Sequence, residues 1–121
     1  YRLRGGQLTP LTADHTLVQE MLDNGLITAE QAAVHPYRGR ISRCLGHGKN
    51  RSEPTINQFE FERGDNVLLC SDGLSDVVDE TEIAALIGQR DVRDACRRLI
   101  EAANKGGGPD NISALIIRRV V

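Results

Sequence analysis

Two segments of the chain carry the strongest β-strand signals. Residues 67–70 are an uninterrupted apolar run, Val-Leu-Leu-Cys, and residues 112–121 are rich in β-branched side chains. Short apolar runs between turn residues are typical of strands inside a sheet. We therefore predict a central strand over 67–70 that is buried on both faces, and a final strand over 112–121.

Weaker signals predict three further extended segments. Gly5-Gly6 separates two short alternating stretches, which predicts a hairpin over residues 1–11. Residues 55–62 alternate between polar and apolar side chains, although Ile56, Phe59 and Phe61 are not in strict phase, and we predict a half-buried strand there. A short strand over 41–45 is predicted within a basic stretch that otherwise has the composition of a loop.

Capping signals and apolar spacing predict four helices. Thr16 with Gln19, and Thr28 with Gln31, have the spacing of capping boxes, in which each side chain accepts a backbone N–H of the other residue. Asp79 is placed to cap a third helix, and three consecutive glycines follow the fourth. The predicted helices cover residues 16–25, 28–35, 79–87 and 92–103.

Length and composition place the chain among globular proteins. It has 121 residues, enough for one domain, with 40% apolar and 26% charged residues. A net charge of −2 gives no general attraction to nucleic acid or to an anionic membrane, and no apolar run is long enough to cross a bilayer. Because aromatic content is only 3% and the first residues already follow a strand pattern, we expect that an N-terminal segment is missing.

Cysteine and histidine spacing argues against disulfides and zinc. The odd number of cysteines and their wide separation fit neither a disulfide framework nor a zinc site, and the three histidines match no common zinc spacing. We expect buried free thiols in a reducing compartment, and therefore a cytoplasmic protein. These residues are Cys44, Cys70, Cys96, His15, His35 and His47.

The motif with the most chemical content, Ser71-Asp72-Gly73, follows the predicted central strand. A carboxylate directly after a buried apolar strand is poorly solvated and needs a partner. Gly73 would let the backbone turn sharply away from the strand. Asp-Gly is also a common turn dipeptide, so a purely structural turn is the alternative for this motif taken alone.

A second carboxylate, Asp110, stands shortly before the final strand and behind Gly106-Gly107-Gly108-Pro109. If the two strands are antiparallel neighbours, the end of one lies beside the start of the other, and Asp72 and Asp110 converge. Close carboxylates repel each other unless a cation lies between them. Oxygen-only ligation favours a hard ion such as Mg²⁺ or Mn²⁺ over zinc. A loop turn is the alternative for Asp110 alone.

Taken together, SDGLSD after an apolar strand and GGGPDN before one resemble C-terminal signature motifs of the type 2C protein phosphatases. The segment LTADHTLVQEMLDNGLITAEQAAVHPYRGRISRCLG is similar to the segment between the two sheets in bacterial members of that family, and FERGDNVLLCSDGLSD is similar to the strand and loop that follow. The resemblance covers nearly all of the chain, in the family's order and spacing.

This resemblance implies an α+β fold, part of a four-layer α-β-β-α sandwich with antiparallel sheets whose N-terminal half is missing here. It implies hydrolysis of phosphoserine and phosphothreonine by a water activated at two or three Mn²⁺ or Mg²⁺ ions. Asp72 and Asp110 would be metal ligands, with Asp72 also the candidate for a third ion. The family's phosphate-binding arginine and metal-bridging aspartate have no counterpart here, so no further catalytic residue is assigned.

The resemblance also implies partners: a phosphoprotein substrate, a Ser/Thr kinase or its targets, and an N-terminal half or another chain that completes the site. Nucleic acid and membrane are not expected. Residues 14–45 resemble the flap beside the family's cleft, where Arg38, Arg40 and Arg43 would attract a phosphopeptide unless they form a solvated basic loop. Two other functions stay open: an inactive phosphatase-like regulatory or binding module, and a different metal-dependent phosphoester hydrolase.

Overall fold

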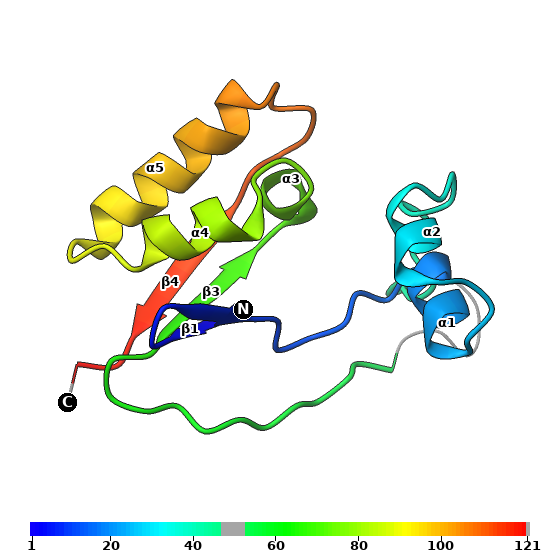
Figure 1. The fold of residues 1–121 in the computed structure, drawn as a ribbon, viewed down its shortest axis with the longest axis horizontal. Coiled ribbons are helices and arrows are strands. Elements are labelled where there is room, and N and C mark those ends of the chain that lie inside the picture. The colour runs from blue at the N-terminus through cyan, green and yellow to red at the C-terminus, as the bar shows by residue number, and fades with distance from the viewer. Residues whose placement is uncertain (47–52, 121) are drawn as a thin grey trace. The chain divides into compact units, whose positions relative to one another are not determined.

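The computed structural model describes residues 1–46 and 53–120 (Figure 1). The chain divides into two compact units, one formed by Tyr1–Leu11 with Phe59–Val121 and the other by Thr12–Gln58. The first unit contains a β-sheet and three helices, and the second contains two short helices. Among the described residues, no helix combines the length and hydrophobicity needed to span a bilayer.

The first unit is built on a four-stranded antiparallel sheet with the strand order β2-β1-β3-β4. Gly5 and Gly6 both adopt positive φ, 57° and 85°, which suits the tight turn of the predicted hairpin. The hairpin and the two apolar strands are confirmed, although the last strand is shorter than the predicted 112–121. The strands are β1 (Arg2–Arg4), β2 (Gln7–Thr9), β3 (Asn66–Cys70) and β4 (Ala114–Arg118).

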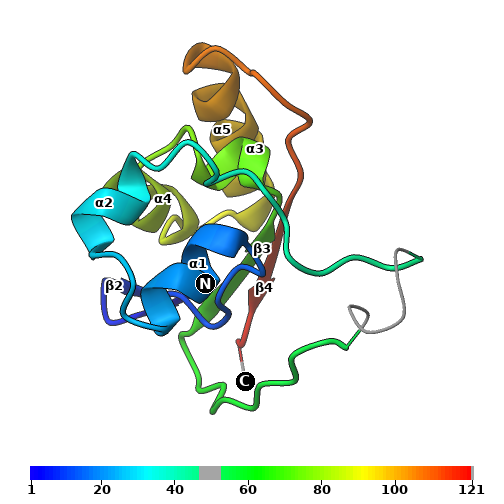
Figure 2. The same ribbon diagram turned by 90° about the vertical axis from the view of Figure 1, so that its right-hand side faces the viewer.

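Helices α4 (Glu80–Ile87) and α5 (Val92–Lys105) lie over one face of this sheet, and the short α3 (Asp72–Ser75) follows β3 (Figures 1 and 2). As predicted, Asp79 caps α4, and Asp91 caps α5 in the same way, each through a side-chain oxygen that accepts a backbone N–H of the first turn. Apolar side chains from both helices pack against the sheet, and this burial supplies the main stabilisation of the unit. The core consists of Leu3, Leu68, Leu74, Val78, Ile83, Ile87, Leu99 and Ala103.

The opposite face of the sheet stays largely uncovered in the described part of the chain. The register pairs Leu69 with Leu115 and Val67 with Ile117, which places these four side chains on that face. Leu69, Leu115 and Ile117 are 54%, 53% and 46% exposed, whereas Val67 on the same face is buried. The prediction that residues 67–70 are buried on both faces is therefore wrong at Leu69, because helices cover only one side of β3.

The predicted strand over residues 55–62 is also wrong, since residues 53–62 form no helix or strand. Ile56 and Phe59 are 84% and 45% exposed. Ile56, Phe59 and Phe61 are three and then two residues apart, so a period of two cannot bury all of them on one face. Phe59 and Phe61 instead pack edge to face, with ring centroids 6.5 Å apart.

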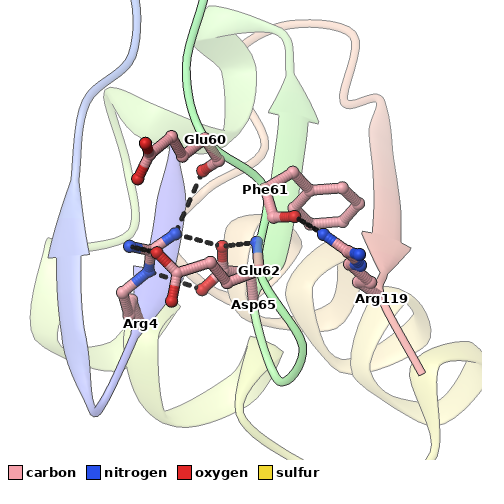
Figure 3. Close-up of polar contacts among 6 residues, drawn as sticks. All are labelled: Arg4, Glu60, Phe61, Glu62, Asp65 and Arg119. Atoms are coloured by element: carbon pink, nitrogen blue, oxygen red, sulfur yellow. Dashed lines mark hydrogen bonds and ion pairs between the residues drawn. The ribbon is translucent and has the colours of Figure 1, made fainter. Parts of the chain in front are cut away.

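A buried carboxylate joins the loop before β3 to the hairpin (Figure 3). Asp65 is 1% exposed, and its two oxygens accept hydrogen bonds from Nε and Nη2 of Arg4 at 2.8 and 2.7 Å. Arg4 also donates to Glu62 Oε1 at 2.6 Å and to the Glu60 carbonyl at 3.0 Å. The Arg4 hydrogen bonds favour the ionised carboxylate and lower the pKa of Asp65 from 3.8 to about 2.

This ion pair predicts a specific pH dependence of stability. Because the pKa of Asp65 is lower in the folded chain than in the unfolded chain, its stabilising contribution is complete above the unfolded pKa of 3.8. The contribution is lost as the pH falls from there towards the folded pKa of about 2. Urea unfolding at pH 6 and pH 3 should therefore give a smaller free energy of unfolding at the lower pH.

Two variants isolate the effect of Asp65. Asp65→Asn should lower the stability at pH 6 and reduce the further loss at pH 3, because the amide has no charge for Arg4 to stabilise. Glu80→Gln, which changes an exposed carboxylate in the first turn of α4, should leave the pH dependence of the unsubstituted chain nearly intact. The same pH dependence in Asp65→Asn as in the unsubstituted chain would contradict the assignment.

The second unit holds α1 (Leu17–Asp23) and α2 (Ala29–Ala33), which confirm the helices predicted in this region with shorter ends. Thr16 accepts a hydrogen bond from the Gln19 amide, and Thr28 forms a complete capping box with Gln31. The predicted strand over 41–45 is reduced to one isolated bridge between Thr16 and Ile41. His47 lies outside the described residues. Cys44, Cys70 and Cys96 form no disulfide in the structure, and they are half-buried rather than buried as predicted.

Candidate metal centre

The candidate site forms where β3 ends and β4 begins. Cys70 and Ala114 are the last residues paired in the ladder, and the Ser71 amide extends it by donating to the Ser113 carbonyl at 3.1 Å. The Ser71 hydroxyl donates to the Asn111 carbonyl and accepts from the Ser113 amide, both at 3.0 Å. Through these contacts one side chain holds the loop before β4 against the end of β3.

Gly73 brings the two loops into direct backbone contact. A Cβ atom at this position would lie 2.3 Å from the Asn111 carbonyl oxygen and 3.5 Å from the Asp110 carbonyl carbon. A Cβ atom cannot lie closer than 3 Å to a backbone atom unless the chain shifts. In this arrangement of the two loops, only glycine therefore fits at position 73. The expectation that Gly73 serves a sharp turn is corrected: it lies within the short α3, its φ is not positive, and it is needed for close approach.

Both predicted ligands lie at this junction. Asp72 is the first residue of α3 and is exposed, and no donor in the described part of the chain contacts its carboxylate. Asp110 is exposed too, and its Oδ1 accepts the neighbouring Asn111 amide at 2.6 Å. Antiparallel pairing of β3 and β4 thus brings the two motifs to one end of the sheet, through the contact of Gly73 with the backbone of residues 110 and 111.

The donor set at this junction is made of oxygen atoms. Two carboxylates with free oxygens suit Mg²⁺ or Mn²⁺ better than zinc, which favours histidine and cysteine. In residues 1–46 and 53–120, no group of three or more His, Cys, Asp or Glu side chains is arranged to hold an ion. The two carboxylates at this junction are of the kind that a hard divalent ion prefers.

Other acidic and histidine side chains have structural partners. Asp79, close in sequence to Asp72, accepts the Glu82 amide at 3.0 Å and so acts as a helix cap. In the second unit, His15 Nε2 lies 2.8 Å from Thr55 Oγ1, and His35 Nδ1 accepts the Tyr37 amide at 3.2 Å. These contacts agree with the view that His15 and His35 are structural.

Sequence reasoning missed the contribution of Ser71 and Asn111 to this junction. Both residues stand inside the two recognised motifs, beside the aspartates. The sequence around Ser71 does not predict which group its hydroxyl will hydrogen-bond to, because that partner lies about 40 residues away in sequence. The Ser71 contact could only have been found from the pairing of β3 with β4.

Relatives of known name cover almost the whole chain. It is 46% identical over 117 residues to the serine/threonine protein phosphatase PstP of Mycobacterium tuberculosis. The aligned residues make up 96% of this chain and 22% of that protein. It is 38% identical over 121 residues to the serine/threonine phosphatase stp of Listeria welshimeri. This alignment covers 98% of this chain and 47% of that protein. No family model matches the chain.

Solved structures show the same fold. A crystal structure of the M. tuberculosis serine/threonine phosphatase PstP/Ppp superimposes with a TM-score of 0.86 at 40% identity, covering 100% of this chain and 51% of that chain. The chain matches the C-terminal half of the type 2C phosphatase catalytic domain. Its small antiparallel sheet and helices are the corresponding part of the type 2C fold, which confirms the predicted α+β class and a partial domain.

The comparison also bears on the metal. The PstP catalytic domain in complex with two manganese ions superimposes on this type 2C half-domain with a TM-score of 0.79 at 41% identity, covering 100% of this chain and 49% of that chain. Manganese is therefore bound by a relative of the same fold. The chain spans about half, or less, of the length of the relatives it matches.

Proposed function

We propose that this chain is the C-terminal half of a catalytic domain that hydrolyses phosphoserine and phosphothreonine in proteins with Mn²⁺ or Mg²⁺. The observation that carries the proposal is the junction of two carboxylate motifs at one end of the sheet, where Gly73 touches the backbone of Asn111. The relatives named as serine/threonine phosphatases, and the two manganese ions bound by PstP, support it.

In this proposal Asp72 and Asp110 are metal ligands. When bound, the ions supply an activated water near neutral pH and neutralise the negative charge of the phosphoryl group. The part of this chain is to hold two carboxylates in position. Ser71 fixes the loop that carries Asp110, and the first turn of α3 orients Asp72. Precise positioning matters because small displacements of ligands weaken metal sites and reduce activity.

The remainder of the site is proposed to come from an N-terminal half of the same domain or from another chain. Two carboxylates leave most of an ion's usual six positions to other ligands, and a phosphate also needs a binding group. Residues 1–121 would form one portion of the catalytic domain, with residues 14–45 as a flap-like segment. We propose a phosphoprotein substrate, with a Ser/Thr kinase or its targets as partners, and a cytoplasmic location that the free thiols support.

A phosphatase assay with two samples tests this proposal. The 121-residue chain alone should hydrolyse a phosphothreonine peptide with Mn²⁺ no faster than buffer does. The complete catalytic domain, in which this chain follows its N-terminal half, should hydrolyse the same peptide, and a chelator should abolish the reaction. Hydrolysis by the complete domain that persists after the chelator has removed divalent ions would contradict the proposed mechanism.

The alternative to an enzyme is an inactive phosphatase-like regulatory or binding module. An inactive module would bind phosphoprotein partners without turnover even when the domain is complete. Hydrolysis by the complete domain would therefore favour the phosphatase, and binding without hydrolysis would favour the inactive module. A different phosphoester hydrolase would instead act on small phosphoesters and leave the phosphopeptide intact.

A further inference from the structure

The loop that joins α5 to β4, residues 106–113, runs past the segment that follows β3 and contacts it near both of its ends (Figures 1 and 2). At the start of the loop, a Cβ atom on Gly106 would lie 2.2 Å from Cγ1 of Val77, so these two residues are closely packed. Near its end, the Asn111 carbonyl lies against Gly73. Asp110 stands between these two contacts, and its backbone is therefore restrained from both sides.

The Ser71 hydroxyl adds two hydrogen bonds at the end of this loop. It donates to the Asn111 carbonyl and accepts the Ser113 amide, both at 3.0 Å. The carbonyl belongs to the peptide group between residues 111 and 112, and the amide belongs to the peptide group that follows. One hydroxyl group therefore fixes the orientation of two consecutive peptide groups.

The Asp110 carboxylate is oriented in turn by Asn111. Its Oδ1 accepts the Asn111 amide at 2.6 Å, while its Oδ2 receives no hydrogen bond from residues 1–46 and 53–120. Asn111 is thus held at its carbonyl by Ser71 and holds the carboxylate through its amide. A chain of contacts leads from the Ser71 hydroxyl through the Asn111 backbone to Asp110, and it leaves Oδ2 available to a ligand.

Such a chain of contacts has a consequence for ion binding. The partners that orient a metal ligand from behind strongly influence the affinity for the metal, although they never touch it. A carboxylate that is already oriented loses less conformational entropy when an ion binds. Ser71 uses both of its hydrogen-bonding capacities on backbone groups, so it can act on an ion only through the residues that it holds.

We propose that Ser71 is a positioning residue of the metal centre, whose hydroxyl orients the Asp110 carboxylate through Asn111 and thereby increases the affinity for Mn²⁺. The inference rests on the proposed phosphatase function, in which Asp110 is a metal ligand. Because the hydroxyl acts on ion binding and not on the chemical step, an excess of Mn²⁺ compensates for its loss.

Manganese titration of the metal-free complete domain tests this role without substrate. By calorimetry, Ser71→Ala should raise the Kd for Mn²⁺ about tenfold, as expected for the loss of a group that supports a ligand. In hydrolysis of p-nitrophenyl phosphate, the KM for Mn²⁺ should rise in parallel, whereas kcat at saturating Mn²⁺ should stay within about twofold. Ser71→Thr keeps a hydroxyl group and should restore most of the affinity. An unchanged Kd in Ser71→Ala, or equal losses in the two variants, would overturn the proposal.

Two control variants separate positioning from a general loss of stability. Ser113→Ala is the same exchange across the ladder, at an exposed residue that takes part in the junction through its backbone amide and carbonyl. Ile83→Val removes a methyl group from the fully buried core position on α4 and destabilises the fold away from the junction. Both should keep the Mn²⁺ affinity of the unsubstituted domain. A loss in Ile83→Val equal to that in Ser71→Ala would mean that stability alone controls the affinity.

Amide hydrogen exchange tests the contacts themselves. In the metal-free complete domain, Ser71→Ala should make the Ser113 amide exchange at least about tenfold faster, because its acceptor is lost and the loop opens more often. Amides between residues 114 and 118, inside the ladder of β3 and β4, should keep their rates. Unchanged exchange at Ser113 would show that the hydroxyl does not hold the loop.

The proposed function has a separate readout in the unsubstituted complete domain. If this domain neither binds Mn²⁺ nor hydrolyses p-nitrophenyl phosphate or a phosphothreonine peptide, the phosphatase itself is refuted. If it does both, and Ser71→Ala binds Mn²⁺ equally well, only the role of Ser71 is refuted.

Discussion

Asp72→Asn in the complete catalytic domain is expected to lower Mn²⁺-dependent hydrolysis of a phosphothreonine peptide by at least about 100-fold. Mutation of residues that only support metal ligands already lowers metal affinity or activity by roughly 10–100-fold, and loss of a ligand should cost more. The amide keeps the shape of the side chain and removes the charge that attracts the ion. The free energy of unfolding should change by no more than about 1 kcal/mol, because Asp72 is exposed and no donor in the described chain contacts its carboxylate.

Three measurements make this test specific. Steady-state kinetics with Mn²⁺ gives the activity, calorimetry gives the affinity for Mn²⁺, and urea unfolding gives the stability. Asp79→Asn is the matched control, because it is the same exchange a few residues along the chain, at a helix cap where asparagine also works. Near-normal turnover in Asp72→Asn, or an equal loss in Asp79→Asn, would show that Asp72 is not a metal ligand.

Gly73→Ala is expected to damage both the fold and the metal site. Alanine should favour a helical position by about 1 kcal/mol over glycine if space allowed it. The new Cβ would instead lie 2.3 Å from the Asn111 carbonyl oxygen. Overpacking of this kind costs about 1–3 kcal/mol, so the clash outweighs the propensity, and the forced shift also separates the segments that carry Asp72 and Asp110.

Urea unfolding and Mn²⁺ titration of the complete domain measure the two effects of Gly73→Ala. Gly39→Ala serves as control, since no atom lies within 4 Å of its Cβ position and its φ is not positive. The control should change stability by no more than about 0.5 kcal/mol. If Gly73→Ala is as stable as Gly39→Ala and binds Mn²⁺ equally well, then close approach of the two loops is not what the glycine provides.

The sequence by itself determined the elements whose signals are local. Thr16, Thr28 and Asp79 were recognised as helix caps because a cap bonds to an amide two or three residues away. Gly5-Gly6 marked the hairpin because two adjacent residues at positive φ favour glycine. The order and spacing of SDGLSD and GGGPDN also pointed to the type 2C family and to Asp72 and Asp110 as candidate ligands.

Only the tertiary structure decided how these pieces meet. Local pattern could not show that Leu69 lies on the uncovered face of the sheet, since its burial depends on what packs there. It could not exclude a strand at residues 55–62, because a strand needs a neighbour that supplies hydrogen bonds. The joining of the two carboxylate motifs depends on Ser71 and Gly73 meeting Asn111, about 40 residues away in sequence, and such contacts are created only by the pairing of β3 with β4.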